Sequence, residues 1–166
     1  MPQPINYLGL VWGDLQARIR EALVSRYELK AESEAALTFR GSVAQEPAGI
    51  EALFTGGELD RIVIRIDTTD REDAATRRLL TSLFALYEHR HGPSASRPPA
   101  DSAGSPALHG EWQDAQACLR LATVTEARRR FVVIAYARLD TPGPQESSRD
   151  PGAGQQEPPP ARPTTA

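Results

Sequence analysis

The sequence has few of the residues that build covalent or metal-linked scaffolds. Its 166 residues include a single cysteine, Cys118, so an intramolecular disulfide and a site of paired cysteines are both excluded. Lys30 is the only lysine, and all other basic side chains are arginines. The formal net charge is −3, whereas nucleic-acid-binding domains are usually clearly basic, so we expect no nucleic-acid partner.

Long hydrophobic runs are also lacking. No stretch approaches the apolar length that a membrane-spanning helix requires, so we expect no membrane span. The first seven residues lack the basic and apolar regions of a secretory signal, which predicts a cytoplasmic protein. An upstream start that carried such a signal would instead permit an envelope location.

Two segments have almost nothing apolar to bury. Residues 141–166 contain no large apolar residue and seven of the fourteen prolines, and residues 93–110 contain four prolines and one large apolar residue, Leu108. Such segments cannot offset the entropy of ordering their backbones. We therefore predict one domain over residues 5–140, with a flexible low-complexity insert at 93–110 and a disordered tail at 141–166.

The remaining chain alternates between helical and extended patterns. Asp14 stands as an N-cap before Leu15, Ile19 and Leu23, whose spacing predicts an amphipathic helix over about 14–26. Strands are expected at 36–40, 50–54 and 59–66, the last two joined by a Gly-Gly hairpin.

A second helix and two further strands follow. Thr69 to Glu72 fits a capping box, a leucine-rich stripe follows it, and Gly92 with Pro93 predicts where the helix ends. Strands are then expected at 115–124 and 130–136. The resulting order α-β-β-β-α-β-β predicts an α+β fold in which two helices pack on one face of an antiparallel sheet of about five strands.

The motif Gly9-Leu10-Val11-Trp12-Gly13-Asp14 resembles the entry to the first helix in small bacterial domains of unknown function. Together with Phe54-Thr55-Gly56-Gly57-Glu58-Leu59 and a tryptophan before the closing hairpin, it is similar to the BamE/SmpA-like envelope domains over about residues 9–137. That resemblance implies an envelope assembly role and supplies no catalytic residues. The element order separately resembles that of type III secretion chaperones, which are small, acidic and dimeric.

Several clusters suggest chemistry and have a simpler explanation. His89, His91 and His109 do not have the spacing of a chelate, and we expect no metal or other cofactor. The carboxylates Asp67, Asp70, Glu72 and Asp73 suit a helix N-terminus, and the run Arg128–Arg130 suits a charged turn. Cys118 is expected to be a buried thiol. None of these clusters forms a catalytic constellation, so we expect a protein that is not an enzyme.

The favoured function is a protein-interaction or assembly module. A two-layer α+β fold leaves one sheet face available to an unknown protein partner or to a second copy in a homodimer. The possible interaction face comprises Arg61, Val63, Arg65, Val132, Ile134 and Tyr136. The alternatives are a type III secretion chaperone-like dimer, or a small ligand-binding domain or enzyme with a pocket between the second helix and the sheet. That pocket would be lined by Asp67, Tyr87, His89 and Trp112.

Overall fold

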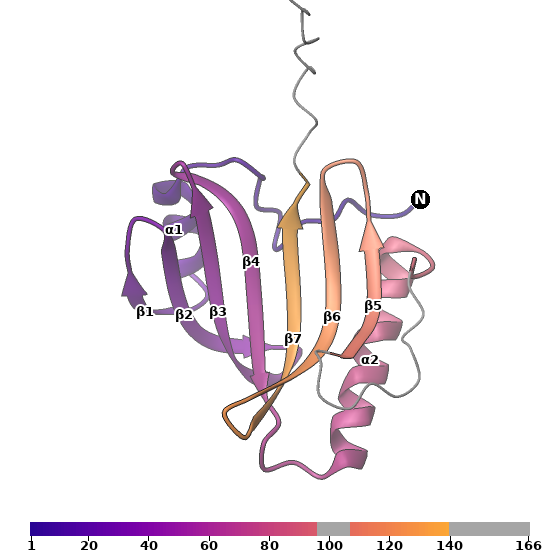
Figure 1. Cartoon of the computed structure of the whole chain (residues 1–166). Helices are drawn as coiled ribbons and strands as arrows, with labels where there is room; N and C mark the ends of the chain where they lie inside the picture. Colours follow the sequence, from indigo (N-terminus) through magenta and orange to yellow (C-terminus); the bar gives the residue numbers. More distant parts are fainter. Residues whose placement is uncertain (96–106, 140–166) are drawn as a thin grey trace, which may run out of the picture.

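The structure is a computed structural model, and it describes residues 1–95 and 107–139. Two helices and seven strands are present in this part of the chain (Figure 1). In chain order they are α1 Gln16–Val24, β1 Glu28–Glu32, β2 Ala36–Val43, β3 Glu46–Thr55, β4 Glu58–Asp67, α2 Asp73–His91, β5 Ala107–Gln113, β6 Ala117–Glu126 and β7 Arg129–Arg138. The predicted tail at 141–166 and most of the predicted insert lie outside the described residues.

All seven strands form one antiparallel sheet in the order β1-β2-β3-β4-β7-β6-β5. The predicted α+β class and antiparallel sheet are confirmed, and the prediction of about five strands is wrong. The two unpredicted strands, β1 and β5, are the two edges of the sheet. An edge strand pairs on one side only, so it can form without the alternating apolar pattern that marks a central strand.

The two edge strands were missed in the sequence for different reasons. In β1 only Leu29 is half-buried, and Glu28, Lys30 and Glu32 are exposed charges. In β5 the first four residues fall in the segment that the sequence assigns to the low-complexity insert, and a register shift lies between Leu108 and Gly110.

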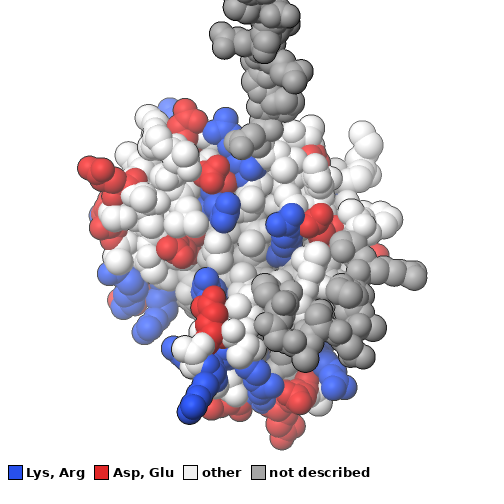
Figure 2. Space-filling view, in the orientation of Figure 1, with Lys and Arg blue, Asp and Glu red and all other residues white. Residues whose placement is uncertain are grey.

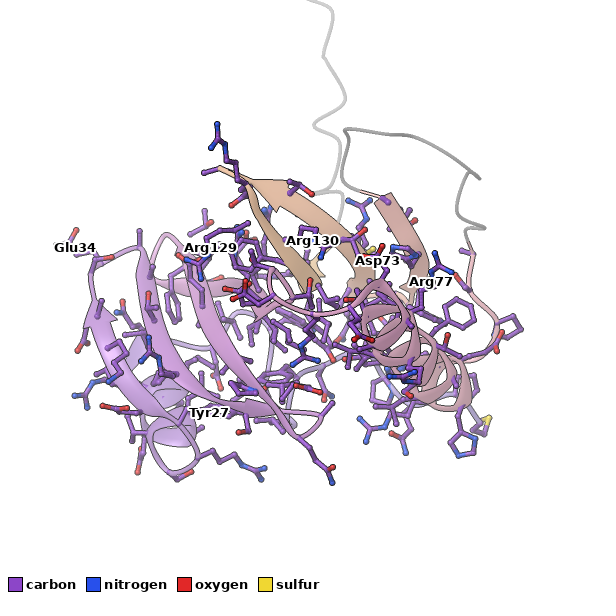
Figure 3. All side chains as sticks on the ribbon, turned by 90° about the horizontal axis from the view of Figure 1, so that it is seen from below. Tyr27, Glu34, Asp73, Arg77, Arg129 and Arg130 are labelled. Carbon is purple, nitrogen blue, oxygen red and sulfur yellow. The ribbon has the colours of Figure 1, made fainter. Side chains whose placement is uncertain are left out.

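Both helices pack on the same face of the sheet, as predicted (Figure 3). Helix α1 contributes Ile19 and Leu23 to the core, and α2 contributes Leu83 and Tyr87. Opposite them lie the inward residues of the strands, among them Phe39, Ile50, Ile62, Ile64, Ile66, Leu119, Leu121, Val132 and Ile134. The other face of the sheet is covered by no helix of the described chain.

The helix ends differ from the prediction at their N-termini. Leu15 occupies the N-cap of α1 and its side chain is 62% exposed, while Asp14 instead forms an ion pair with Arg18. The predicted capping box at α2 is also wrong, because Thr69 bonds to Asp67 in a turn before the helix. The predicted C-terminus is confirmed at Gly92, whose φ of 85° is readily adopted by glycine.

The first fifteen residues run across the helix-covered side of the sheet. The backbone N–H of Gln3 donates to the Arg90 carbonyl oxygen at 2.8 Å, and the backbone N–H of Ile5 donates to the Asp114 carboxylate at 2.6 Å. Ile5 and Tyr7 are buried in the core, and the Trp12 indole donates to the Ile5 carbonyl. This segment therefore fills the space between the end of α2 and the start of α1.

Candidate functional site

The six residues of the predicted interaction face do not lie on one face. Val132, Ile134 and Tyr136 are buried at 0%, 0% and 4% exposure, so the expectation that they point outward is wrong. They pair directly with Ile66, Ile64 and Ile62 of β4, and paired residues of neighbouring strands point to the same side. The other three residues of the predicted interaction face, Arg61, Val63 and Arg65, point to the opposite side of the sheet.

The helix-free surface, which we call the open face, is centred on Val63, Val133 and Ala135. These three residues are half-buried, and the register pairs Val63 with Ala135 and Arg65 with Val133. Ala122 on β6 continues the apolar surface beside Val133. Figure 2, which views this face, shows uncharged atoms over much of its middle, with acidic and basic groups lying next to one another among them.

Three ion pairs lie within the open face. Arg65 binds Glu126 at 3.0 Å and Arg120 binds Glu111 at 2.6 Å, while Arg129 pairs with Asp67. Each pair joins residues of two strands, and all these side chains keep contact with solvent. Exposed pairs of this kind add little to stability. They leave a surface on which neither sign of charge dominates.

A hollow of about 490 Å³ lies at the end of the open face nearest the β2–β3 and β6–β7 turns. The Arg65 and Arg129 guanidinium groups lie 5.9 and 5.4 Å from the Phe131 ring centroid, so the ring is in contact range of two cations. Bonds from Thr69, and then the contact with Arg129, lower the pKa of Asp67 to about 2. The hollow thus holds an ionised carboxylate between arginines.

A second concave region lies on the helix-covered side, where α2 faces the β2–β3 hairpin. Strand β2 curves behind the sheet so that its end approaches α2 (Figure 1). One part of this region has a volume of about 600 Å³ and is lined by Glu46, Arg71, Arg78 and Leu79, among others. The adjoining part, of about 290 Å³, shares Leu83 and Leu86 with it and reaches Arg90. We call the combined feature the α2 groove.

All four tyrosines of the chain line the inner end of the α2 groove. The Tyr7 and Tyr27 hydroxyls are 2.6 Å apart, and the Tyr136 hydroxyl lies 3.5 Å from that of Tyr87. Burial raises the pKa of Tyr7, Tyr87 and Tyr136 above the ordinary value of 10.0. These hydroxyls therefore stay protonated at neutral pH and act as hydrogen-bonding groups of the core.

The pocket predicted between the second helix and the sheet does not assemble from the expected residues. Tyr87 and Trp112 meet in the core with ring centroids 5.6 Å apart, but Asp67 lies on the open face. His89 is exposed on the last turns of α2. The α2 groove occupies the expected place between helix and sheet, with Tyr87 as the only residue in common.

The other clusters singled out in the sequence make structural contacts. His91 Nδ1 lies 2.9 Å from the Gln3 carbonyl oxygen, and His109 Nε2 lies 3.0 Å from Thr123 Oγ1, so the histidines are held in separate contacts. No group of three or more His, Cys, Asp or Glu side chains in residues 1–95 and 107–139 is arranged to hold a metal ion. Burial raises the pKa of the Cys118 thiol, which disfavours its nucleophilic thiolate form.

The arginine run divides between the two sides of the sheet. Arg129 points to Asp67 on the open face, whereas Arg130 points to Asp73 in the first turn of α2 at 2.8 Å (Figure 3). Arg130 also donates to the carbonyl oxygens of Thr69 and Arg71. Asp67 and Asp73 of the acidic cluster are therefore engaged in ion pairs that fix the β4–α2 connection to β7.

Comparison with known proteins gives no matching family model, no matching curated protein and no matching solved structure. The resemblances to BamE/SmpA-like envelope domains and to type III secretion chaperones therefore stay predictions. Within the described part of the chain, neither helix has the length and hydrophobicity needed to cross a membrane.

Sequence reasoning missed the α2 groove because its walls come from several segments that are far apart in the chain. One signal was present: Arg78, Ser82, Leu86 and Arg90 recur every four residues, so they form a continuous stripe that winds slowly around a helix. Nothing in the sequence indicated that the β2–β3 hairpin would face that stripe.

Proposed function

We propose that the protein is a non-enzymatic protein-interaction module whose open face packs against another protein subunit. The observation that carries this proposal is the helix-free sheet surface with Val63, Val133 and Ala135 at its centre. Three of the arginines around this centre, Arg65, Arg120 and Arg129, are already paired with carboxylates of the same face, so a partner can cover the apolar surface without breaking those pairs.

A second copy of the chain is the occupant that fits these features. A surface dominated by one sign of charge would repel its own copy, but the ion pairs of the open face leave no such excess. Two sheets can pack face to face at about 10 Å separation. From strand spacing and residue rise, a seven-stranded face covers about 800 Å², which matches the contribution of one partner to a standard interface of about 1,600 Å². A dimer also agrees with the resemblance to type III secretion chaperones.

The shifted pKa values support a binding role over a catalytic one. Asp67, Asp73 and Glu46 have lowered pKa values because each accepts hydrogen bonds, from Thr69, Arg130 and Arg71 respectively. Groups held in this way are ionised and engaged, which suits structural ion pairs better than proton transfer.

The test is the solution mass of the full chain, measured by light scattering over a range of concentrations. Val133→Asp places a charge at the centre of the open face, and Thr81→Asp places the same charge on an exposed position of α2. We expect the wild type and Thr81→Asp to dimerise and Val133→Asp to remain a folded monomer. A monomeric wild type at every concentration, or a dimer that Val133→Asp leaves intact, would contradict the proposal.

A further inference from the structure

The α2 groove has one cation at its inner end, a second partway along it, and apolar side chains between them. Arg78 and Arg90 are both exposed, and neither forms an ion pair with a carboxylate in the described residues, whereas Arg71 is paired with Glu46. Leu79, Leu83 and Leu86 lie between the two arginines. The groove therefore combines two available cations with a hydrophobic surface, and it lies on the side of the sheet opposite the open face.

The spacing of the two arginines is set by the helix. They are twelve residues apart, which places their Cα atoms about 18 Å apart along the axis of α2 and about 120° apart around it. Both side chains nevertheless line the groove. An extended peptide advances about 3.3 Å per residue, so residues i and i+6 lie about 20 Å apart and point to the same side. Residues i+2 and i+4 point to that side as well, and would face the leucines.

We propose that the α2 groove binds an extended peptide segment with two acidic side chains six residues apart and apolar side chains between them. Charge complementarity places one carboxylate at Arg78 and the other at Arg90. Ser82, which lies between the arginines, and Gln45 on the hairpin provide polar groups for the peptide backbone. A single-headed amphiphile such as a fatty acid would use only one of the two cations, so the presence of two separated cations favours the peptide.

The groove has room for such a segment. Its two parts, of about 600 and 290 Å³, adjoin at Ala44, Leu83 and Leu86 and extend from Arg71, just before α2, along the helix to Arg90. The tyrosine hydroxyls at the inner end are bonded to one another, so the peptide contacts their rings without competing for unsatisfied groups.

The experiment uses the full chain and a fluorescently labelled peptide, Glu-Ser-Leu-Ser-Leu-Ser-Glu, with binding followed by fluorescence anisotropy. We expect saturable binding that weakens as salt is raised. Each of Arg78→Gln and Arg90→Gln should weaken binding about fivefold, and the two together about 25-fold. Arg77→Gln is the matched control, because Arg77 lies on α2 outside the groove, and it should bind as the wild type does (Figure 3).

The proposal would be overturned if the wild type showed no binding at a peptide concentration of about 1 mM. It would also be overturned if a peptide with Gln in place of both Glu residues bound as tightly as the original peptide, or if Arg77→Gln lost as much affinity as Arg78→Gln or Arg90→Gln. Displacement of the peptide by dodecanoate in both the wild type and Arg78→Gln would assign the groove to a single-headed amphiphile instead. Circular dichroism of each variant checks that the fold is retained. Val133→Asp should bind the peptide as the wild type does. The peptide proposal and the open-face dimer can therefore fail independently of each other.

Discussion

Tyr7 and Tyr136 pack against each other with ring centroids 5.5 Å apart and an interplanar angle of 49°. Tyr7 belongs to the N-terminal segment, and Tyr136 lies on β7, a central strand of the sheet. The contact ties the start of the chain to the last strand of the fold. The hydroxyl contact of Tyr7 with Tyr27 extends this connection to the residue just before β1.

Because of this cluster, the protein should lose stability in alkali. Burial raises the pKa of Tyr7, Tyr87 and Tyr136, whereas in the unfolded chain they titrate near 10.0. Above pH 10 the unfolded state releases these protons first, so the free energy of unfolding falls as pH rises and is unaffected by them below that pH. Urea unfolding at several pH values between about 8 and about 11 measures the slope. Tyr7→Phe should make the fall of the unfolding free energy with pH less steep, and an unchanged dependence on pH would contradict this account.

Neighbouring residues of β7 should respond in opposite ways to the same substitution. Ile134→Asp buries an unpaired charge in the core and should cost more than about 4 kcal/mol, enough to unfold the domain. Val133→Asp places the charge on the open face and should change the stability of the monomer by less than about 1 kcal/mol. Thermal unfolding followed by circular dichroism distinguishes them. A folded Ile134→Asp variant would show that the assignment of the two faces is wrong.

Two strand glycines should differ in their tolerance of alanine. A Cβ on Gly110 would lie 2.5 Å from the Trp112 ring and 3.1 Å from Phe84, both of which pack in or against the core. Gly110→Ala should therefore destabilise the fold by about 1–3 kcal/mol. A Cβ on Gly49 would meet no other side chain or strand within 4 Å, so Gly49→Ala should be neutral or slightly stabilising. Denaturant unfolding of both variants is the measurement, and equal effects would contradict the packing at Trp112.

The Asp67 carboxyl should titrate with a pKa of about 2. Its pKa is lowered first by the bonds from Thr69 and then by Arg129. Thr69→Ala, which removes the hydroxyl bond and keeps the backbone bond, and Arg129→Gln should therefore each raise the pKa part of the way toward the ordinary value of 3.8. Since the folded-state pKa is the lower one, these contacts stabilise the fold above about pH 4 and are lost as pH falls toward 2. Carboxyl chemical shifts recorded during an acid titration of the two variants measure these rises, and an unchanged pKa in either variant would contradict this account.

The sequence alone determined the features that depend on local pattern. The alternation of Ile62, Ile64 and Ile66 with Arg61, Val63 and Arg65 predicted both the strand and which of its residues face inward. The Gly56-Gly57 turn and the end of α2 at Gly92 were equally readable, because each needs a left-handed backbone that glycine adopts easily.

Only the tertiary structure decided which side of β7 is buried. In the run from Phe131 to Tyr136 both alternating sets of side chains are apolar, so the periodicity does not indicate which set faces the core. The pairing of Ile134 with Ile64 places Val132, Ile134 and Tyr136 on the core side. The edge strands followed from neighbours that offered unpaired backbone groups, since β1 and β5 have little apolar pattern of their own. The α2 groove arises because the curvature of β2 brings its hairpin to the helix, and such long-range packing leaves no trace in local spacing.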